Sequence, residues 1–220
     1  MMSNLKNYEN YDKIEVGIDE AGLGSVAGSF FVAAVILPKE CPDDNDIKLW
    51  NSIKDSKKIS KKKRYIIADY IKDICIDYAI IEVTNKQVDA SNILIARLAS
   101  YHRLLDKLCT TPDTILIDGD KFEPYVNEND VYIPHICVIG GDNKYKSIAA
   151  ASILAKTEKD NHIDRIDKEY PVYSWKDNNG YLTKIHNERI LKYGITPYHR
   201  KTFGICKQWE ELPQIYIKNL

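Results

Sequence analysis

Four acidic side chains come directly or shortly after segments that have the composition of buried β-strands. The acidic residues are Asp19, Glu20, Asp118 and Asp142, and the segments are 14–18, 114–117 and 136–139. Carboxylates at the ends of neighbouring strands can converge at one edge of a sheet, and oxygen donors suit Mg²⁺ or Mn²⁺ rather than zinc. Two such ions, about 4 Å apart, can bind the attacking water and the leaving oxygen of a phosphodiester. Spacing alone leaves a second interpretation open, because acidic residues after strands often only form turns.

The segments that must position these side chains alternate between two kinds of hydrophobic pattern. Runs rich in β-branched and aromatic residues predict strands at 14–18, 30–37, 76–83, 114–117 and 136–139. Helical periodicity predicts helices at 61–74 after the capping residue Ser60, from Asp89 or Ser91 to about Leu108, at 146–165 and at 183–191. Two consecutive strands followed by alternating helices and strands indicate a mixed α/β sheet.

Composition and charge exclude several classes of protein. The chain has 220 residues, of which 44% are hydrophobic, so a large core is available, yet no apolar run is long enough to span a bilayer. The polar segment 1–11 does not have the pattern of a secretory signal. The five cysteines are odd in number and widely spaced, which argues against disulfides and thiolate zinc sites. We therefore expect a cytoplasmic protein without a membrane partner, and we expect a monomer.

Local charge is more informative than the net charge of −1. The segment 54–64 (KDSKKISKKKR) is strongly basic. Such a run is often only the solvated start of a helix, but it can also bind a charged polymer.

Six sequence blocks resemble motifs of the ribonuclease HII family, the type 2 ribonucleases H, and they occur in the order of that family. The first block is VGIDEAGLG at 16–24. The others are DSKKIS at 55–60, LIDG at 116–119, GD at 141–142 with SIAAASILAK at 147–156, GYLT at 180–183 with His186, and YHRKTF at 198–203. Together they extend from about residue 14 to 204, and six blocks in one order are not expected by chance.

The resemblance implies a ribonuclease H-like mixed β-sheet flanked by helices, with a helical C-terminal portion. A single catalytic domain would span 1–220, with a core at about 12–170 and a substrate-binding portion at about 171–220. Asp19, Glu20, Asp118 and Asp142 would be catalytic and would bind two Mg²⁺ or Mn²⁺ ions. The substrates would be RNA–DNA hybrids and duplex DNA with embedded ribonucleotides, cut to leave 3′-hydroxyl and 5′-phosphate ends. A role in ribonucleotide excision repair or replication follows.

A second set of residues is expected to contact the substrate. Telling RNA from DNA requires reading the 2′-hydroxyl, which backbone groups beside glycines can approach. Phosphate contacts position a duplex without reading its sequence. The resemblance places Tyr181 against the deoxyribose of the RNA-to-DNA step, whereas His186 could lie near a phosphate or make a core contact. The expected substrate-binding residues are Gly22, Leu23, Gly24, Ser56, Lys57, Lys58, Ser147, Tyr181, Thr183, His186 and Arg200.

The chain departs from the family pattern at three positions near the expected substrate face. Leu23 stands in place of the arginine of a glycine–arginine–glycine motif, Ser25 in place of a proline, and Gly140 in place of a basic residue. Loss of the arginine contact should weaken binding of the RNA–DNA junction by about 1–3 kcal/mol.

Two other functions therefore stay open. The chain could be a hybrid-specific ribonuclease with weak incision at single ribonucleotides, or a catalytically weakened hybrid-binding protein. Whether the chain contacts a sliding clamp also stays open. The segment 208–213 (QWEELP) is not a convincing clamp-binding peptide.

Overall fold

The structure is a computed structural model that describes residues 5–54 and 56–209. Asp55, the side chain of Lys58 and the segment from residue 210 lie outside the described residues. The chain divides into two compact units. The first comprises residues 1–21, 31–81 and 97–157, and the second comprises 22–30, 82–96 and 158–220.

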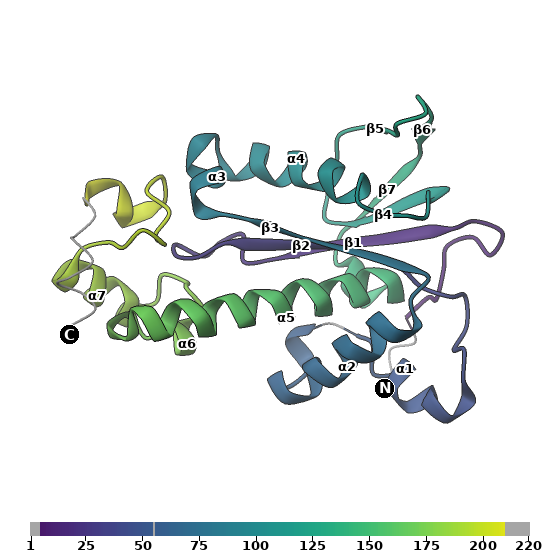
Figure 1. The fold of residues 1–220 in the computed structure, drawn as a ribbon, viewed down its shortest axis with the longest axis horizontal. Helices are drawn as coiled ribbons and strands as arrows, with labels where there is room; N and C mark the ends of the chain where they lie inside the picture. The colour runs from purple at the N-terminus through teal and green to yellow at the C-terminus, as the bar shows by residue number, and fades with distance from the viewer. Residues whose placement is uncertain (1–4, 55, 210–220) are drawn as a thin grey trace. The chain divides into compact units, whose positions relative to one another are not determined.

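A five-stranded mixed sheet forms the centre of the first unit, as the sequence predicts (Figure 1). The strand order is β3-β2-β1-β4-β7. β1 pairs antiparallel with β2 and parallel with β4, and β4 pairs parallel with β7. The strands are β1 (Glu15–Ala21), β2 (Phe30–Ile36), β3 (Asp77–Val83), β4 (Thr114–Asp118) and β7 (His135–Val138). All seven residues of β2 are buried, which is typical of a strand covered on both faces.

Helices cover both faces of this sheet. In Figure 1, α2 (Lys61–Ile74) and the first part of α5 (Lys146–Glu169) lie along one face, and the second half of α4 (Ile93–Leu105) lies along the other. Ser60 caps α2 as expected, accepting a hydrogen bond from the backbone N–H of Lys63. The other elements are α1 (Ile47–Trp50), α3 (Asn85–Ala90), β5 (Tyr125–Val126), β6 (Tyr132–Ile133), α6 (Trp175–Asn178), α7 (Lys184–Tyr193) and short 3₁₀ segments.

The expected start of α4 at Asp89 or Ser91 is wrong. Thr84 forms a capping box with Gln87, so a separate short helix, α3, precedes α4. The carboxamide of Asn92 then accepts a hydrogen bond from the N–H of Ile95 and starts α4. None of the described helices has the length and hydropathy needed to cross a membrane.

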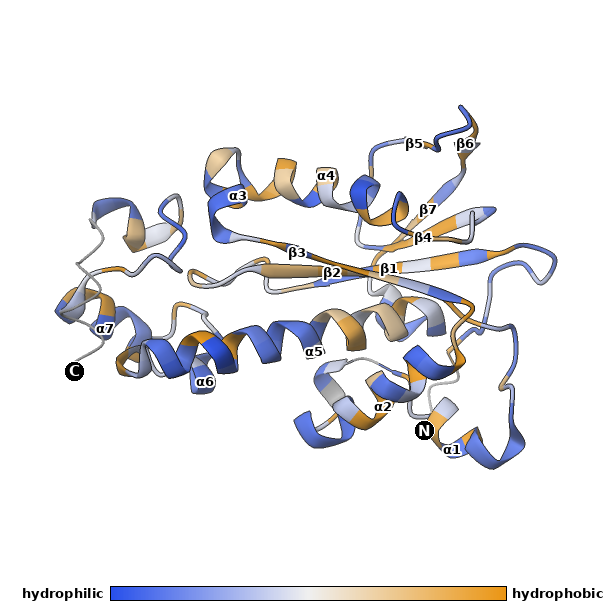
Figure 2. Cartoon of the chain, viewed as in Figure 1, coloured by the Kyte–Doolittle hydropathy of each residue, from blue (hydrophilic) through white to orange (hydrophobic). Residues whose placement is uncertain are grey.

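The start of α5 packs directly on β1. A Cβ atom at Gly17 would lie 2.3 Å from the carbonyl carbon of Ser147, so only glycine fits there. Ala149, Ala150 and Ala151 are fully buried in the same core cluster. Hydrophobic colouring runs along β2 and β3 in Figure 2, consistent with this core. The small residues of the SIAAAS segment therefore serve close contact between helix and sheet.

The second unit has its own core, in which aliphatic side chains pack with aromatic rings that include Tyr173 and Trp175. Two fully buried histidines belong to it, His186 and His199. The indole N–H of Trp175 donates to His186 Nε2 at 3.0 Å, and the N–H of Thr196 donates to His199 Nδ1 at 2.9 Å. His186 Nδ1 lies 2.9 Å from the carbonyl oxygen of Tyr181, and the two Nε2 atoms are 3.2 Å apart. The bonds to Trp175, Tyr181 and Thr196 are all satisfied when both rings are neutral.

Acidification is therefore expected to destabilise the second unit. Burial lowers the pKa of His186 and of His199 below the ordinary value of 6.5. Below about pH 6.5 the two histidines bind protons in the unfolded chain but stay neutral in the folded protein. The free energy of unfolding that they contribute is therefore fully present above about pH 6.5 and is lost as the pH falls below it. The loss is up to about 1.4 kcal/mol per pH unit for each ring.

Urea unfolding at pH 7 and pH 5.5 measures this effect. His199→Asn should reduce the pH dependence of the unfolding free energy relative to the unmodified chain. His102→Asn, on α4 and outside the cluster, is the matched control and should leave it unchanged. Equal pH dependence in all three proteins would contradict the assignment.

Candidate active site

Strand register brings Asp19 and Asp118 side by side. β1 continues to Ala21, so Asp19 and Glu20 lie within the strand rather than after it. Ile18 of β1 pairs with Ile117 of the parallel strand β4, and the next residue on each strand is an aspartate. Parallel strands present their carboxyl ends at the same edge of a sheet. The two aspartates therefore meet at that edge.

Asp142 reaches this region from the loop after β7. Gly140 turns the chain with a left-handed backbone conformation, φ +65°. The N–H of Gly141 then donates to Asp118 Oδ1 at 2.6 Å, which ties this loop to the end of β4. Asp142 is buried and accepts a hydrogen bond from the Asn143 carboxamide at 2.8 Å.

Asp19 and Glu20 contact different helices. Successive residues of a strand point to opposite faces of the sheet. Asp19 accepts a hydrogen bond from the hydroxyl of Ser152 on α5. Glu20 instead forms an ion pair with Arg97 of α4 at 3.0 Å and accepts a 2.5 Å hydrogen bond from Tyr101. The adjacent acids are thus held from the two sides of the sheet.

The carboxylates are crowded and poorly solvated. Burial raises the pKa of Asp19 well above its ordinary value, and the charges of Glu20 and Asp118 raise it further. Burial also raises the pKa of Glu20, while Arg97 and the Tyr101 hydroxyl oppose that increase. Like charges brought together in a buried site favour the binding of a cation.

The donor set fits a hard divalent cation in kind, since every candidate ligand is a carboxylate. Among the described residues, however, no group of three or more His, Cys, Asp or Glu side chains lies close enough together to hold a metal ion. The contacts of Glu20 with Arg97 and Tyr101 turn it toward α4. A complete set of ligands therefore requires side-chain rotation.

Two of the expected substrate-binding residues near this site, Ser56 and Ser147, are buried. Ser56 is 3% exposed, and its hydroxyl lies 3.0 Å from that of Ser152, which in turn binds Asp19. Ser147 is also buried, with its backbone against Gly17. Lys57 is exposed, whereas the side chain of Lys58 is not described.

Arg200, which is expected to contact a phosphate, lies in the second unit. Its guanidinium group is fully buried and donates to the carbonyl oxygens of Leu23 at 2.5 Å, Gly22 at 2.8 Å and Gly28 at 3.1 Å. Lys159 is buried too and donates to the carbonyl oxygen of Ser29 at 3.0 Å. Two buried cations thus hold the carbonyl groups of the glycine-rich loop 22–29.

The opposite side of this loop is available to a ligand. Because the N–H and C=O groups of a trans peptide point in opposite directions, the N–H groups of Leu23 and Gly24 point away from Arg200. Gly24 and Tyr181 are exposed, and a Cβ atom at Gly24 would lie 3.5 Å from the Tyr181 ring. Thr183 is exposed and caps α7, whereas His186 is fully buried and makes the core contact.

Four side chains that support these groups are not among the residues predicted from the sequence: Arg97, Tyr101, Ser152 and Lys159. Arg97 and Tyr101 are four residues apart and share one face of α4. This face of the helix is expected to be apolar. An arginine that shares it with a tyrosine is therefore the signal that identifies this pair. Ser152 and Lys159 carry no comparable signal in the sequence.

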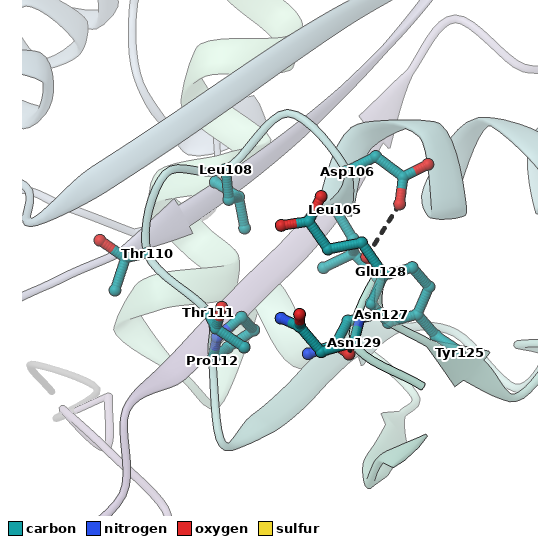
Figure 3. A pocket seen from close by; sticks show the side chains of 10 residues that line it. All are labelled: Leu105, Asp106, Leu108, Thr110, Thr111, Pro112, Tyr125, Asn127, Glu128 and Asn129. Carbon is teal, nitrogen blue, oxygen red and sulfur yellow. Dashed lines mark hydrogen bonds between the residues drawn. The ribbon is translucent and has the colours of Figure 1, made fainter. Parts of the chain in front are cut away.

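A surface hollow lies elsewhere in the first unit, near the end of α4 and the β5–β6 hairpin (Figure 3). The Tyr125 hydroxyl donates to Asp106 at 2.9 Å at its margin. Its lining residues are Leu105, Asp106, Leu108, Thr110, Thr111, Pro112, Tyr125, Asn127, Glu128 and Asn129. None of them is a candidate catalytic or substrate-binding residue.

Comparison with known proteins shows one family. The family model for ribonuclease HII matches residues 16–206. The chain is 46% identical to a ribonuclease HII of Parabacteroides distasonis over 93% of this chain and 96% of that protein. It is 45% identical to a ribonuclease HII of Christiangramia forsetii, over 91% and 96% of the two chains.

Solved structures show the same fold. The crystal structure of ribonuclease H2 from Pyrococcus horikoshii superposes with a TM-score of 0.72 at 24% identity, covering 88% of this chain and 95% of that one. A ribonuclease HIII structure in complex with Mn²⁺ superposes with a TM-score of 0.69 at 21% identity, covering 99% and 74%. With the ordered motifs and the edge-of-sheet carboxylates, these matches establish that the chain belongs to the ribonuclease HII family and is an endoribonuclease.

Proposed function

We propose that this endoribonuclease hydrolyses the RNA strand of RNA–DNA hybrids and cuts 5′ of ribonucleotides embedded in duplex DNA. The observation that carries the proposal is the crowding of buried carboxylates where β1 and β4 end side by side. Asp19, Glu20, Asp118 and Asp142 would bind two Mg²⁺ or Mn²⁺ ions. A site that gathers negative charge in this way is suited to a cationic cofactor and a phosphodiester rather than to a neutral substrate.

The chemistry at this site needs no nucleophilic side chain. Two bound divalent ions would lower the pKa of the attacking water and stabilise the leaving 3′-oxygen. The protein orients the ligands: Ser152 and the N–H of Glu20 fix Asp19, and the N–H of Gly141 fixes Asp118. Hydrolysis in this arrangement leaves 3′-hydroxyl and 5′-phosphate ends.

Selection of a ribonucleotide would use the exposed side of the glycine-rich loop. The N–H groups of Leu23 and Gly24 can donate to the 2′-hydroxyl, which only RNA carries. The Tyr181 ring can stack on the next deoxyribose, where a further 2′-hydroxyl would clash. Lys57, Lys58 and Thr183 would hold phosphates and position the duplex without reading its sequence.

A second candidate function, a preference for long hybrids over single ribonucleotides, is favoured by Leu23. Its side chain has no charge with which to bind the phosphate beside the junction. Long hybrids offer many equivalent registers, so they depend less on one contact. Arg200 holds the backbone of Leu23 from inside, which preserves the loop geometry without an arginine at this position.

Cleavage of labelled duplexes tests the proposal. With Mg²⁺ or Mn²⁺, the protein should cut a duplex with one ribonucleotide and a duplex with an all-RNA strand, but not an all-DNA duplex. Asp19→Asn should reduce kcat by a factor of about 10³ or more, because it removes an ionised ligand. Asp73→Asn makes the same chemical change at an exposed position of α2 and should have no effect.

Cleavage of only the all-RNA strand would support the second candidate function. Tight hybrid binding without cleavage under either metal would contradict both functions. It would instead support a hybrid-binding protein.

Leu23→Arg is expected to improve incision at a single ribonucleotide. The added guanidinium group gains a charged phosphate contact that contributes about 1–3 kcal/mol, or roughly 5- to 100-fold in kcat/KM. Cleavage of the all-RNA strand should change much less. Leu191→Arg adds the same charge at an exposed position of α7 and serves as the control for general attraction to nucleic acid. Equal gains in the two variants would refute a specific role for position 23.

A further inference from the structure

Both carboxylate oxygens of Glu20 are already engaged within the protein. Arg97 Nη2 lies 3.0 Å from Glu20 Oε1, and the Tyr101 hydroxyl donates to Glu20 Oε2 at 2.5 Å. Arg97 Nε also donates to the Tyr101 hydroxyl oxygen at 2.6 Å. The three side chains thus form a closed ring of hydrogen bonds, and each member orients the other two.

Arg97 also contacts the end of the neighbouring strand. Its Nη2 donates to the backbone carbonyl oxygen of Asp118 at 3.3 Å. A Cβ atom at Gly119 would lie 3.0 Å from the same nitrogen, so glycine makes room for the guanidinium group. One cation therefore bridges the ends of β1 and β4, where Glu20 and Asp118 lie.

This cation is poorly screened by solvent. The side chains of Arg97 and Glu20 are only 15% and 10% exposed. Charges that are largely buried are screened much less than charges on the surface. Arg97 consequently acts on Glu20 as a fixed positive charge, at the position from which Glu20 would have to turn to reach a metal ion.

We propose that Arg97, together with Tyr101, is a positioning residue that competes with divalent metal ions for Glu20. This inference rests on the proposed function, because it concerns the metal ions bound by the four carboxylates. Binding of an ion by Glu20 requires that the carboxylate leave Arg97 and Tyr101. The nearby guanidinium charge also repels the incoming cation. Both effects weaken metal binding to the free enzyme.

Removal of Arg97 should therefore tighten metal binding, which damage to the fold would not do. Isothermal titration of the full chain with MnCl₂ alone, at pH 7.5, measures the dissociation constant. Arg97→Met should lower the Mn²⁺ Kd by on the order of tenfold, since it removes one buried positive charge. Tyr101→Phe should lower the Kd by a smaller factor, because the charge stays but one hydrogen bond to Glu20 is lost.

Arg103→Met is the matched control, since it removes the same charge from an exposed position of the same helix. Its Kd should equal that of the unmodified chain. An unchanged or higher Kd in Arg97→Met, with the melting temperature retained, would overturn the proposal. If Arg97→Met does not fold, Tyr101→Phe decides, and an unchanged or higher Kd in that variant overturns the proposal.

The two proposals fail in different ways. If the unmodified chain binds Mn²⁺ and the variants bind it no more tightly, only the role of Arg97 and Tyr101 is rejected. No Mn²⁺ binding by the unmodified chain or by either variant rejects the proposed metal site and this inference together.

Discussion

Mutual repulsion among buried carboxylates is the constraint on which the rest of the first unit depends. The parallel pairing of β1 and β4 places Asp19 beside Asp118, and burial raises the pKa of Asp19 well above its ordinary value. Such an arrangement costs stability unless neighbours offset it. Ser152 offsets it from α5, and Arg97 and Tyr101 offset it from α4. The close packing of α5 on Gly17 sets the start of the helix that carries Ser152.

The glycine-rich loop 22–29 is shaped by buried positive charges rather than by repulsion among buried negative charges. The carbonyl groups of Gly22 and Leu23 face the buried cation of Arg200, so the N–H groups of Leu23 and Gly24 are left to face outward. A second buried cation, Lys159, binds the carbonyl oxygen of Ser29. The shape of the loop thus depends on residues far away in the sequence rather than on the side chain at position 23. This explains how a leucine can replace a charged residue there without loss of the backbone geometry.

Much of the fold follows from local patterns in the sequence. The buried strand β2, the Ser60 cap of α2 and the Thr183 cap of α7 all agree with what their residue types predict. The break between α3 and α4 is not predicted, because the expected start at Asp89 or Ser91 falls between the two actual caps, Thr84 and Asn92. Among the site residues, the ordered motifs predict the four carboxylates, but residue type could not reveal burial. Residue type predicts a phosphate contact for Arg200 and leaves His186 open between a phosphate and a core contact, although both are fully buried.

The central claim is that these four carboxylates bind divalent ions, and anomalous X-ray scattering from crystals grown with Mn²⁺ tests it most directly. The account predicts two Mn²⁺ peaks about 4 Å apart among Asp19, Glu20, Asp118 and Asp142, with Glu20 turned away from Arg97. Two results would contradict this account. One is that Mn²⁺ peaks occur only at other positions, and the other is that no Mn²⁺ peak occurs at saturating Mn²⁺ while Glu20 stays bound to Arg97.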